Sequence, residues 1–454
     1  MTPTTVRRPD RRVRRLAATL YAYAVLRDLV LLYPVYALLF ADTGLSVWQI
    51  STLFVIWSAS GILLEVPSGA LADALSRRLL LCLAPLVTAA GFAVWVLVPS
   101  YPAFAAGFLL WGAGGALASG ALEALVFTEL DHLGAAGRYA RVIGRARTAE
   151  TVGVLASIVL AAPVLAVGGY PAVGAASVLA CLLAAAVATR LPEHHDPDHA
   201  GSGPPGDAAR SGGSARSGVA GGSGGSRDSG GSDGFGRSGQ SGGTDCDDDD
   251  RGDLGWWGSL RAGLAEAHAD RRVRAAVLLV AAVAAVWGAL DEYTPLLARD
   301  TGVSEPAVPL LLLLTWVGVA VGGLLAPAGE RLGRRGYGGL LAGSAVALAV
   351  GALLGQPVGF VLVGAAFGGF QLATVLADAR LQARITGPSR ATVTSLAGMA
   401  TDVTIIAVYA TYGLLATAAG NGVAFAVAAG PYLVMALLMA AGRARRASPA
   451  TRAR

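Results

Sequence analysis

Charged residues occur inside stretches of the sequence that are otherwise apolar. Arg27 and Asp28 interrupt the segment YAVLRDLVLLYP, and Glu65, Glu123 and Asp402 each interrupt another apolar segment. A carboxyl group in low-dielectric surroundings binds a proton readily, and a nearby guanidinium group biases it back toward the ionised form. These residues could therefore load and release protons. Alternatively, they could form ion pairs that only hold helices together.

Long apolar segments must position these charges. The chain has 454 residues, of which 54% are hydrophobic and 14% charged, and its mean hydropathy is +0.58. A helix needs about 20 mainly apolar residues to cross a bilayer. We therefore predict an all-α integral membrane protein with twelve transmembrane helices, in two bundles of six. The predicted spans are 16–40, 48–72, 79–98, 103–126, 142–167, 171–190, 273–298, 307–328, 338–355, 358–381, 391–416 and 423–441.

Arginine is distributed unequally between alternate loops. It is present around residues 77–78, 138–141, 334–335 and 384–390 and in both tails, whereas the opposite loops are almost devoid of it, with Arg299 as the exception. Cationic loop residues are retained on the cytoplasmic side of a membrane. We therefore expect a multi-pass protein of a bacterial cytoplasmic (inner) membrane with both termini cytoplasmic. The net charge of +5 then reflects topology, and we expect no nucleic-acid partner.

A segment dominated by Gly, Ser and Asp separates the two sets of apolar segments. It runs from about residue 196 to 255 and ends in an acidic run. Such a composition cannot bury enough apolar surface to order itself, so we predict a tether. The expected organisation is a basic cytoplasmic tail (1–15), an N-terminal six-helix bundle (16–190), a cytoplasmic linker that ends in an interfacial helix (191–270), a C-terminal six-helix bundle (271–442) and a cytoplasmic tail (443–454).

Related loops recur in the two sets of six. ADTGLS at 41–46 returns as RDTGVS at 299–304, and GALADALSRR at 69–78 returns as APAGERLGRR at 326–335, at nearly the same offset. Two matches at one offset indicate duplication. A parallel repeat of this kind relates the two halves of major facilitator transporters.

The second of these loops resembles the major facilitator superfamily signature Gly-x-x-x-Asp-Arg-x-Gly-Arg-Arg. The first copy matches it at Gly69, Asp73, Arg77 and Arg78. The second copy keeps Glu330, Arg331, Arg334 and Arg335. The first copy departs at Ala74 and Ser76, and the second has Ala326 in place of the glycine. The resemblance covers the chain outside the linker and tails. It implies a secondary transporter that moves a small molecule by alternating access.

The resemblance further implies a conformational latch at this loop, which stabilises the outward-facing state and is released as the halves rock. Asp73 would meet the positive N-terminal end of a neighbouring helix. Glu129 and Glu150 are the candidate partners of Arg77 and Arg78. The alternative is that these charges only set the topology at a surface turn.

The acids and the arginine of the first half could line one cavity, because the first, second and fourth predicted helices carry them. We expect Arg27, Asp28, Glu65 and Glu123 to form a cluster with more acid than base. Adjacent residues on a helix do not face each other, so Arg27 and Asp28 are expected to have separate partners. The alternative is a structural pair between Arg27 and Glu65 or Glu123.

Four acids lie within the predicted spans of the second half. Asp402 is predicted near the middle of the eleventh span, where it could line the cavity or bond to the local backbone. Asp291, Glu292 and Asp378 are predicted near the ends of spans, so we expect them to be interfacial charges rather than transport residues.

Several aromatic residues in the first half could form a pocket for lipophilic or cationic compounds. They are Tyr21, Tyr23, Tyr33, Tyr36, Trp57 and Trp111. The alternative is lipid-facing packing or an interfacial belt. Drug/proton antiporters of the superfamily tend to carry a glycine-rich signature with Gly-Pro in the fifth helix. The positions available here match it poorly: Gly153, Ala162, Pro163, Gly168 and Gly169.

Three functions follow from these observations. The first is proton-coupled efflux of amphipathic or drug-like compounds, with the proton gradient as energy source and no cofactor. The second is an importer or facilitator for a nutrient or metabolite. The third is a polytopic membrane enzyme or receptor, but the sequence carries no nucleophile and base spacing, metal-ligand motif or phosphate loop. We expect no metal site, and we expect a functional monomer whose partners are the lipid bilayer and a small-molecule substrate.

Overall fold

The computed structural model describes residues 7–194, 271–384 and 390–441, and the side chains within these ranges apart from those of residues 7–10, 65–74, 272, 390–392 and 395. The described residues form helices and no strand. Ten of these helices are long and apolar enough to cross a membrane. A helix satisfies its own backbone hydrogen bonds, which lipid cannot do. The predicted all-α fold is confirmed.

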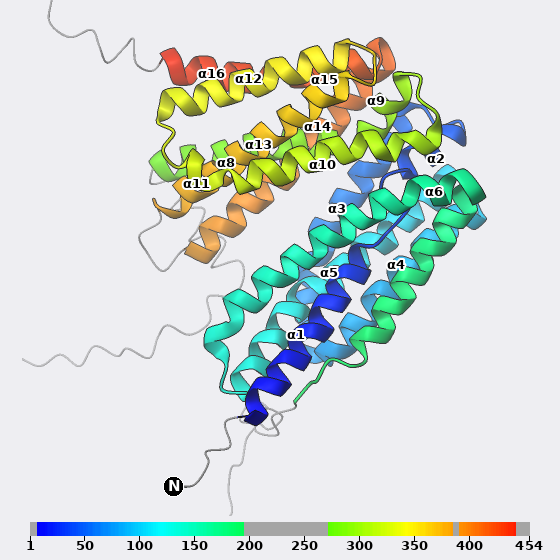
Figure 1. Cartoon of the computed structure of the whole chain (residues 1–454), viewed down its shortest axis with the longest axis vertical. Helices are drawn as coiled ribbons and strands as arrows, with labels where there is room; N and C mark the ends of the chain where they lie inside the picture. The colour runs from blue at the N-terminus through cyan, green and yellow to red at the C-terminus, as the bar shows by residue number, and fades with distance from the viewer. Residues whose placement is uncertain (1–6, 195–270, 385–389, 442–454) are drawn as a thin grey trace, which may run out of the picture. The chain divides into compact units, whose positions relative to one another are not determined.

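The N-terminal half consists of α1 (Arg7–Asp28), α2 (Tyr36–Asp42), α3 (Val47–Ala74), α4 (Arg77–Leu97), α5 (Tyr101–His132), η1 (Ala136–Arg138) and α6 (Tyr139–Ala188) (Figure 1). The C-terminal half consists of α8 (Arg271–Asp291), α9 (Thr294–Asp300), η3 (Glu305–Ala307), α10 (Val308–Leu324), α11 (Ala326–Gly329), α12 (Arg334–Leu353), α13 (Gly359–Gln382), α14 (Arg390–Ala419), α15 (Asn421–Ala428) and α16 (Gly430–Ala441).

The helix α6 holds two of the predicted spans. Gly169 adopts a φ of 62°, a conformation open to glycine, and Pro171 follows it. The chain therefore turns within α6. Together α1 and α2 make up the first span, which is broken, so each of the twelve predicted spans corresponds to helix in the structure.

The first helix of each half is interrupted. The helix α1 ends at Asp28, and α2 begins at Tyr36 after Pro34; α8 ends at Asp291, and α9 begins at Thr294 before Pro295. Proline lacks the N–H that would continue a helix. In the first break, the backbone N–H of Leu32 donates to Ser177 Oγ on α6 at 2.9 Å.

One predicted boundary differs from the structure, and other predicted segments lie outside the described residues. The helix α1 begins at Arg7, so residues 7–15 of the predicted basic tail belong to a helix; Pro9 lies in its first turn, where proline is tolerated. The interfacial helix, most of the predicted linker (195–270) and the tail from residue 442 lie outside the described residues.

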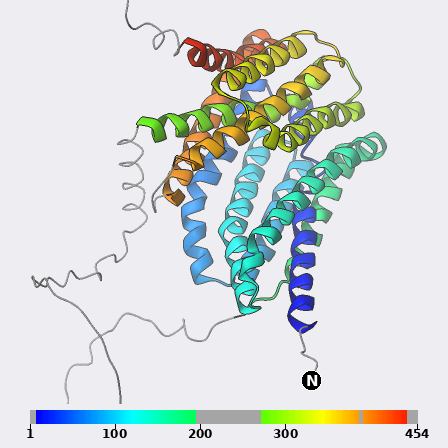
Figure 2. The same cartoon turned by 60° about the vertical axis from the view of Figure 1, so that its left-hand side comes forward.

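Within each half, helices pack closely where they carry small residues. The helix α1 runs alongside α6 in both views (Figure 1 and Figure 2). In the C-terminal half, a Cβ added to Gly318 or Gly322 of α10 would collide with the backbone of Gly364 or Gly368 of α13. Glycines four residues apart on both helices let the two backbones approach in this way.

The described residues up to Glu193 and from Arg271 onward belong to one compact unit, and the two halves touch within it. The helices α3 and α14 make the most extensive contact, followed by α6 and α10. The hydroxyl groups of Ser51 and Tyr293 lie 2.7 Å apart. Tyr33 donates to Asp291 Oδ2 at 2.9 Å, and these residues are 258 positions apart. Asp42 and Asp300, which match in the repeated loop, are also 258 positions apart. Tyr33 and Asp291 therefore occupy equivalent positions of the two halves.

Candidate functional site

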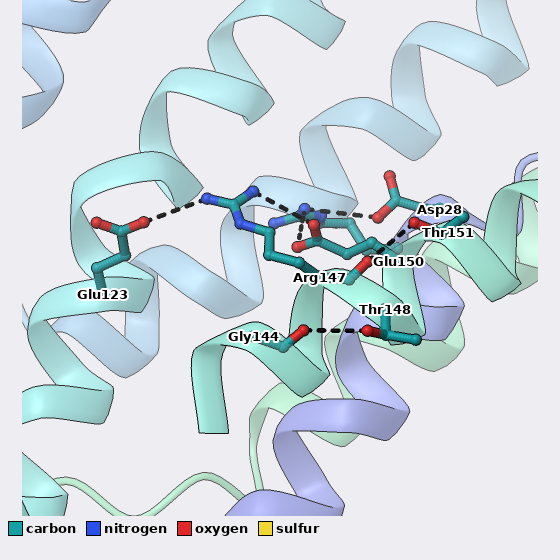
Figure 3. Close-up of polar contacts among 8 residues, drawn as sticks. Asp28, Glu123, Gly144, Arg147, Thr148, Glu150 and Thr151 are labelled. Atoms are coloured by element: carbon teal, nitrogen blue, oxygen red, sulfur yellow. Dashed lines mark hydrogen bonds and ion pairs between the residues drawn. The ribbon is translucent and has the colours of Figure 1, made fainter. Parts of the chain in front are cut away.

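Two arginines and three carboxylates form a continuous charge network in the N-terminal half (Figure 3). Arg27 Nη2 lies 2.8 Å from Glu150 Oε1 and 3.5 Å from Asp28 Oδ2. Arg147 lies 3.2 Å from Glu150 Oε2 and 3.2 Å from Glu123 Oε1. Glu150 is thus held by both arginines, and Asp28 and Glu123 occupy the two ends of the network.

Three helices position the network. Arg27 and Asp28 are the last two residues of α1, and Glu123 lies on α5. Arg147 and Glu150 are three residues apart on α6, so they share one face of that helix. Gly153 allows α1 and α6 to approach, because a Cβ there would lie 2.5 Å from the Val25 carbonyl oxygen and 3.3 Å from Asp28 Cβ.

The exposed side of the network faces a cavity of about 570 Å³, which we call the network cavity. Arg27, Asp28, Glu123 and Arg147 line it, together with Trp57, Trp111 and Trp316. Exposure of the side chains is 63% for Arg147 and 51% for Glu123 but only 14% for Glu150. The central carboxylate is therefore the one most protected from solvent.

The composition of the network differs from the expected cluster. Arg147 was not among the predicted residues, and Glu150 was assigned to the latch; both belong to the network. Arg27 contacts Asp28 despite the expectation of separate partners, because α1 ends at Asp28 and the long arginine side chain reaches past the helix end. The side chain of Glu65 lies outside the described residues, although its backbone belongs to α3.

A second cavity, of about 500 Å³, lies between the halves, and we call it the inter-half cavity. It is lined by Trp57 of α3 and Trp111 of α5 from one half and by Glu292, Asp402 and Tyr409 from the other. Asp402, predicted as a cavity residue, lines this cavity rather than the network cavity. The Trp57 and Trp111 rings stack with centroids 4.9 Å apart and line both cavities.

Two acids expected at the membrane interface lie instead in the protein interior. Asp291 accepts the hydrogen bond from Tyr33, and Glu292 is 8% exposed. We expected interfacial charges, and hydropathy did not reveal that Glu292 is buried within the protein at the break between α8 and α9. Pro295, at the start of α9, was the available signal. Asp378, the third acid of that group, is exposed on α13.

The predicted latch residues lie at the other ends of these helices. Arg77 donates to Thr128 Oγ1 at 2.9 Å, and its backbone N–H donates to Glu193 Oε1 at 2.7 Å. Ser76 also donates to Glu193. A carboxylate at the N-terminus of α4 opposes the positive end of the helix dipole. Glu193, which no motif indicated, therefore provides at α4 the contact expected of Asp73.

The remaining latch residues differ in exposure where the structure describes them. Glu129 is 2% exposed. The side chains of the second copy are exposed at the surface: Glu330, Arg331, Arg334 and Arg335. Next to them, Arg380 of α13 donates to the Leu332 carbonyl at 3.0 Å and stacks over the Tyr337 ring. Gly69 and Asp73 belong to α3, but their side-chain surroundings lie outside the described residues.

An ion pair joins the halves near the first loop of each. Asp42 Oδ1 lies 2.9 Å from Arg299 Nη1, and Tyr170 donates to Asp42 Oδ2 at 2.6 Å. The side chains of Asp42 and Arg299 are about one third exposed. In the part of the chain that the structure describes, no group of His, Cys, Asp and Glu could hold a metal ion. Most of the histidine-rich stretch at 194–199 lies outside that part.

Comparison with known proteins gives one family and several structural neighbours. Residues 22–387 match the family described as Major Facilitator Superfamily. No curated protein matches the sequence. The structure resembles the nucleoside transporter NupG, with a TM-score of 0.66 and 12% identity over 94% of this chain and 98% of that one.

Two further neighbours have different titles. A bacterial homologue of the human lysosomal transporter Spinster, in an inward-facing, unoccupied conformation, gives a TM-score of 0.62 and 16% identity over 96% of each chain. A D-xylose–proton symporter gives 0.60 and 15% identity over 94% of this chain and 96% of that one. At these identities, the likeness shows the shared fold alone.

Proposed function

Because the chain belongs to the major facilitator superfamily, we propose that it is a proton-coupled exporter of amphipathic or drug-like compounds. The observation that carries this proposal is the charge network beside the network cavity. Three carboxylates face two arginines there, so one carboxyl group can hold a proton while each arginine keeps a carboxylate partner. Titratable groups that line a cavity and are perturbed by charged neighbours are candidates for function.

Asp28 is the residue that we assign to proton coupling. Glu150 is held by two arginines at 2.8 and 3.2 Å, whereas Asp28 contacts Arg27 at 3.5 Å. Protonating Asp28 therefore removes the weakest ion pair with Arg27 and leaves the Arg27–Glu150 pair in place. Asp28 also lines the network cavity, where a substrate can alter its surroundings.

The aromatic lining supports an amphipathic substrate. Trp57, Trp111 and Trp316 contribute apolar faces to the network cavity, beside the charges of Arg147 and Glu123. Binding sites for small molecules commonly combine apolar and aromatic walls with a few polar groups. A compound with one apolar and one polar part fits such a surface better than a sugar, which needs many hydrogen-bonding groups.

Alternating access would use the contacts between the halves. The Asp42–Arg299 pair and the Ser51–Tyr293 contact hold the two halves together on the side of the Asp42 loop. By the distribution of arginine, we infer that this side faces outward and that both termini are cytoplasmic. Release of the substrate outward would then require these contacts to break. We infer a monomer in the cytoplasmic membrane, driven by the proton gradient without a cofactor.

Inside-out membrane vesicles with an acid interior and a pH-sensitive dye test the proposal. A transported compound added outside should cause proton release from vesicles that contain the wild type. Vesicles that contain Asp28→Asn should show little release. Asp131→Asn, which changes an exposed acid near the end of α5, is the matched control and should behave as the wild type.

Two results would contradict the proposal. Equal proton release by the wild type and Asp28→Asn would remove Asp28 from the coupling mechanism. Proton movement in the same direction as the compound would indicate symport and favour the second candidate, an importer of a nutrient or metabolite.

A further inference from the structure

The inter-half cavity is distinct from the network cavity in its charge. Its lining residues include two carboxylates, Glu292 and Asp402, and no arginine among those that the structure describes. They come from α3 and α5 of one half and from α8, α14 and the break after α8 of the other. Both halves therefore contribute to the cavity, and its side chains must separate or close together when the halves move.

Glu292 is the most constrained of the acids in this cavity. It is 92% buried, since its exposure is 8%, and it lines the cavity. Its neighbour Asp291 receives a hydrogen bond from Tyr33. The described part of the chain offers the Glu292 carboxyl group no hydrogen bond and no ion pair. An ionised carboxylate in such surroundings carries a large desolvation cost unless a positive charge compensates it. A cation bound in the cavity would provide this compensation.

The walls of the cavity suit the same kind of ligand. The stacked rings of Trp57 and Trp111 lie on one side, and Tyr409, which is 3% exposed, lies on the other half. Aromatic faces attract cations within about 6 Å, more strongly when water is excluded. The same rings provide apolar surface for the rest of the ligand. The volume of about 500 Å³ is in the range of drug-sized binding sites.

We propose that the inter-half cavity binds a monovalent organic cation with an apolar body, such as a protonated amine or a quaternary ammonium or phosphonium ion, with Glu292 as its counter-ion. The inference rests on the proposed function in one respect, because it takes the bound cation to be the transported compound. Trp57 and Trp111 line both cavities, so the cation would bind next to the charge network without pairing with its acids.

Binding of tetraphenylphosphonium and tetraphenylborate tests the inference, because the two ions match in size and shape and differ in the sign of their charge. Equilibrium dialysis uses the purified full-length chain in a non-ionic detergent at pH 8, with a detergent blank. The wild type should bind the cation more tightly than the anion. A separation of about 7 Å at an effective dielectric constant of about 20 predicts that Glu292→Gln weakens cation binding by about 50-fold. Asp131→Asn should have no effect.

A second variant places a positive charge in the cavity. A Cβ at Gly288 meets nothing within 4 Å, and Gly288 precedes Glu292 by four residues. In Gly288→Lys, the lysine ammonium group should pair with Glu292, take the place of the bound cation and abolish cation binding. Gly288→Met, with similar bulk and no charge, should keep the preference for the cation.

Three results would overturn the inference. They are equal affinity of the wild type for both ions, a cation preference that persists in Glu292→Gln, and equal effects of Gly288→Lys and Gly288→Met. If Glu292→Gln still binds tetraphenylborate, its cavity is intact and its loss of cation binding can be interpreted. If it binds neither ion, the comparison of Gly288→Lys with Gly288→Met tests the inference instead. If the wild type shows no preference for the cation but normal compound-driven proton release, this inference is rejected and the proposed function is kept. Cation binding without compound-driven proton release would reject the proposed function alone.

Discussion

Replacing Arg27 with glutamine removes the cation that joins Asp28 and Glu150. Two unit charges about 4 Å apart attract by about 4 kcal/mol at an effective dielectric constant of about 20. The desolvation of both groups offsets part of this attraction. Glu150 is 14% exposed and keeps Arg147 at 3.2 Å, so it does not lose all compensation. We expect Arg27→Gln to lower the free energy of unfolding by about 2–3 kcal/mol, less than the about 3–5 kcal/mol of a fully buried pair that loses one partner, because Arg27 is 28% exposed.

Thermal unfolding followed with a thiol-reactive fluorescent dye measures this loss. Cys181 is buried and becomes reactive when the helices separate, and a Cys82→Ala, Cys246→Ser background removes the partly exposed thiol of α4 and the thiol in the predicted linker. With an unfolding entropy of about 2.1 cal/mol/K per residue, the loss corresponds to a fall in Tm of about 3 °C. Arg145→Gln, which changes an exposed arginine of α6, is the control and should leave Tm unchanged.

A double-mutant cycle with Glu150→Gln separates the ion pair from other effects of the substitution. If the pair carries the stability, the double variant should unfold at a higher temperature than the sum of the two single losses predicts, because the pair can be lost only once. Strictly additive losses, or an Arg27→Gln Tm equal to that of the wild type, would refute the assignment of Arg27 and Glu150 as partners.

The remaining predictions concern close packing and the contact between the halves. Gly153→Val should separate α1 from α6, destabilise the protein by about 1–3 kcal/mol and reduce proton coupling, as thermal unfolding and the vesicle assay would show. Gly322→Val should destabilise by a similar amount through its clash with α13, whereas Gly323→Val, with nothing near its Cβ, should not; equal Tm values would contradict this. Asp42→Asn removes the ion pair with Arg299 that holds the halves together. A cysteine introduced into the inter-half cavity should then be alkylated up to about five times faster, since an exposed ion pair contributes about 0–1 kcal/mol. Exchanging the charges of Asp42 and Arg299 should restore the wild-type rate.

The spans could be predicted from the sequence because hydropathy depends on composition over about 20 residues. Local departures within a span were not visible in this way. The break after Asp28 does not lower the mean hydropathy of the segment, because the residues between α1 and α2 are themselves apolar. The break between α8 and α9 contains only Glu292 and Tyr293, too few residues to change a mean taken over about 20.

The partners within the network could not be predicted because hydropathy does not give the rotation of a helix about its axis. Glu150 and Arg147 lie near an arginine-rich loop, which favoured a surface assignment for Glu150. Their positions three residues apart did indicate a shared face, but only the packing of α6 on α1 directs that face toward Arg27. Gly153 was a signal for this close approach.

The loop motif identified the family but not the local partners. The signature positions Arg77 and Arg78 are present, yet the carboxylate that contacts the α4 N-terminus is Glu193, more than a hundred residues away in sequence. Spacing along the chain cannot indicate such a contact, because it depends on where α6 ends relative to α4.

The central claim is that Asp28 couples proton movement to transport through the charge network. Proteoliposomes with an imposed pH gradient and a fluorescent amphipathic compound test it most directly, by comparing gradient-driven accumulation with counterflow of labelled against unlabelled compound. We predict that Asp28→Asn loses gradient-driven accumulation but retains counterflow, because binding and alternation of access do not require that proton. Accumulation by Asp28→Asn equal to that of the wild type, or wild-type accumulation that persists when an ionophore collapses the gradient, would contradict the account.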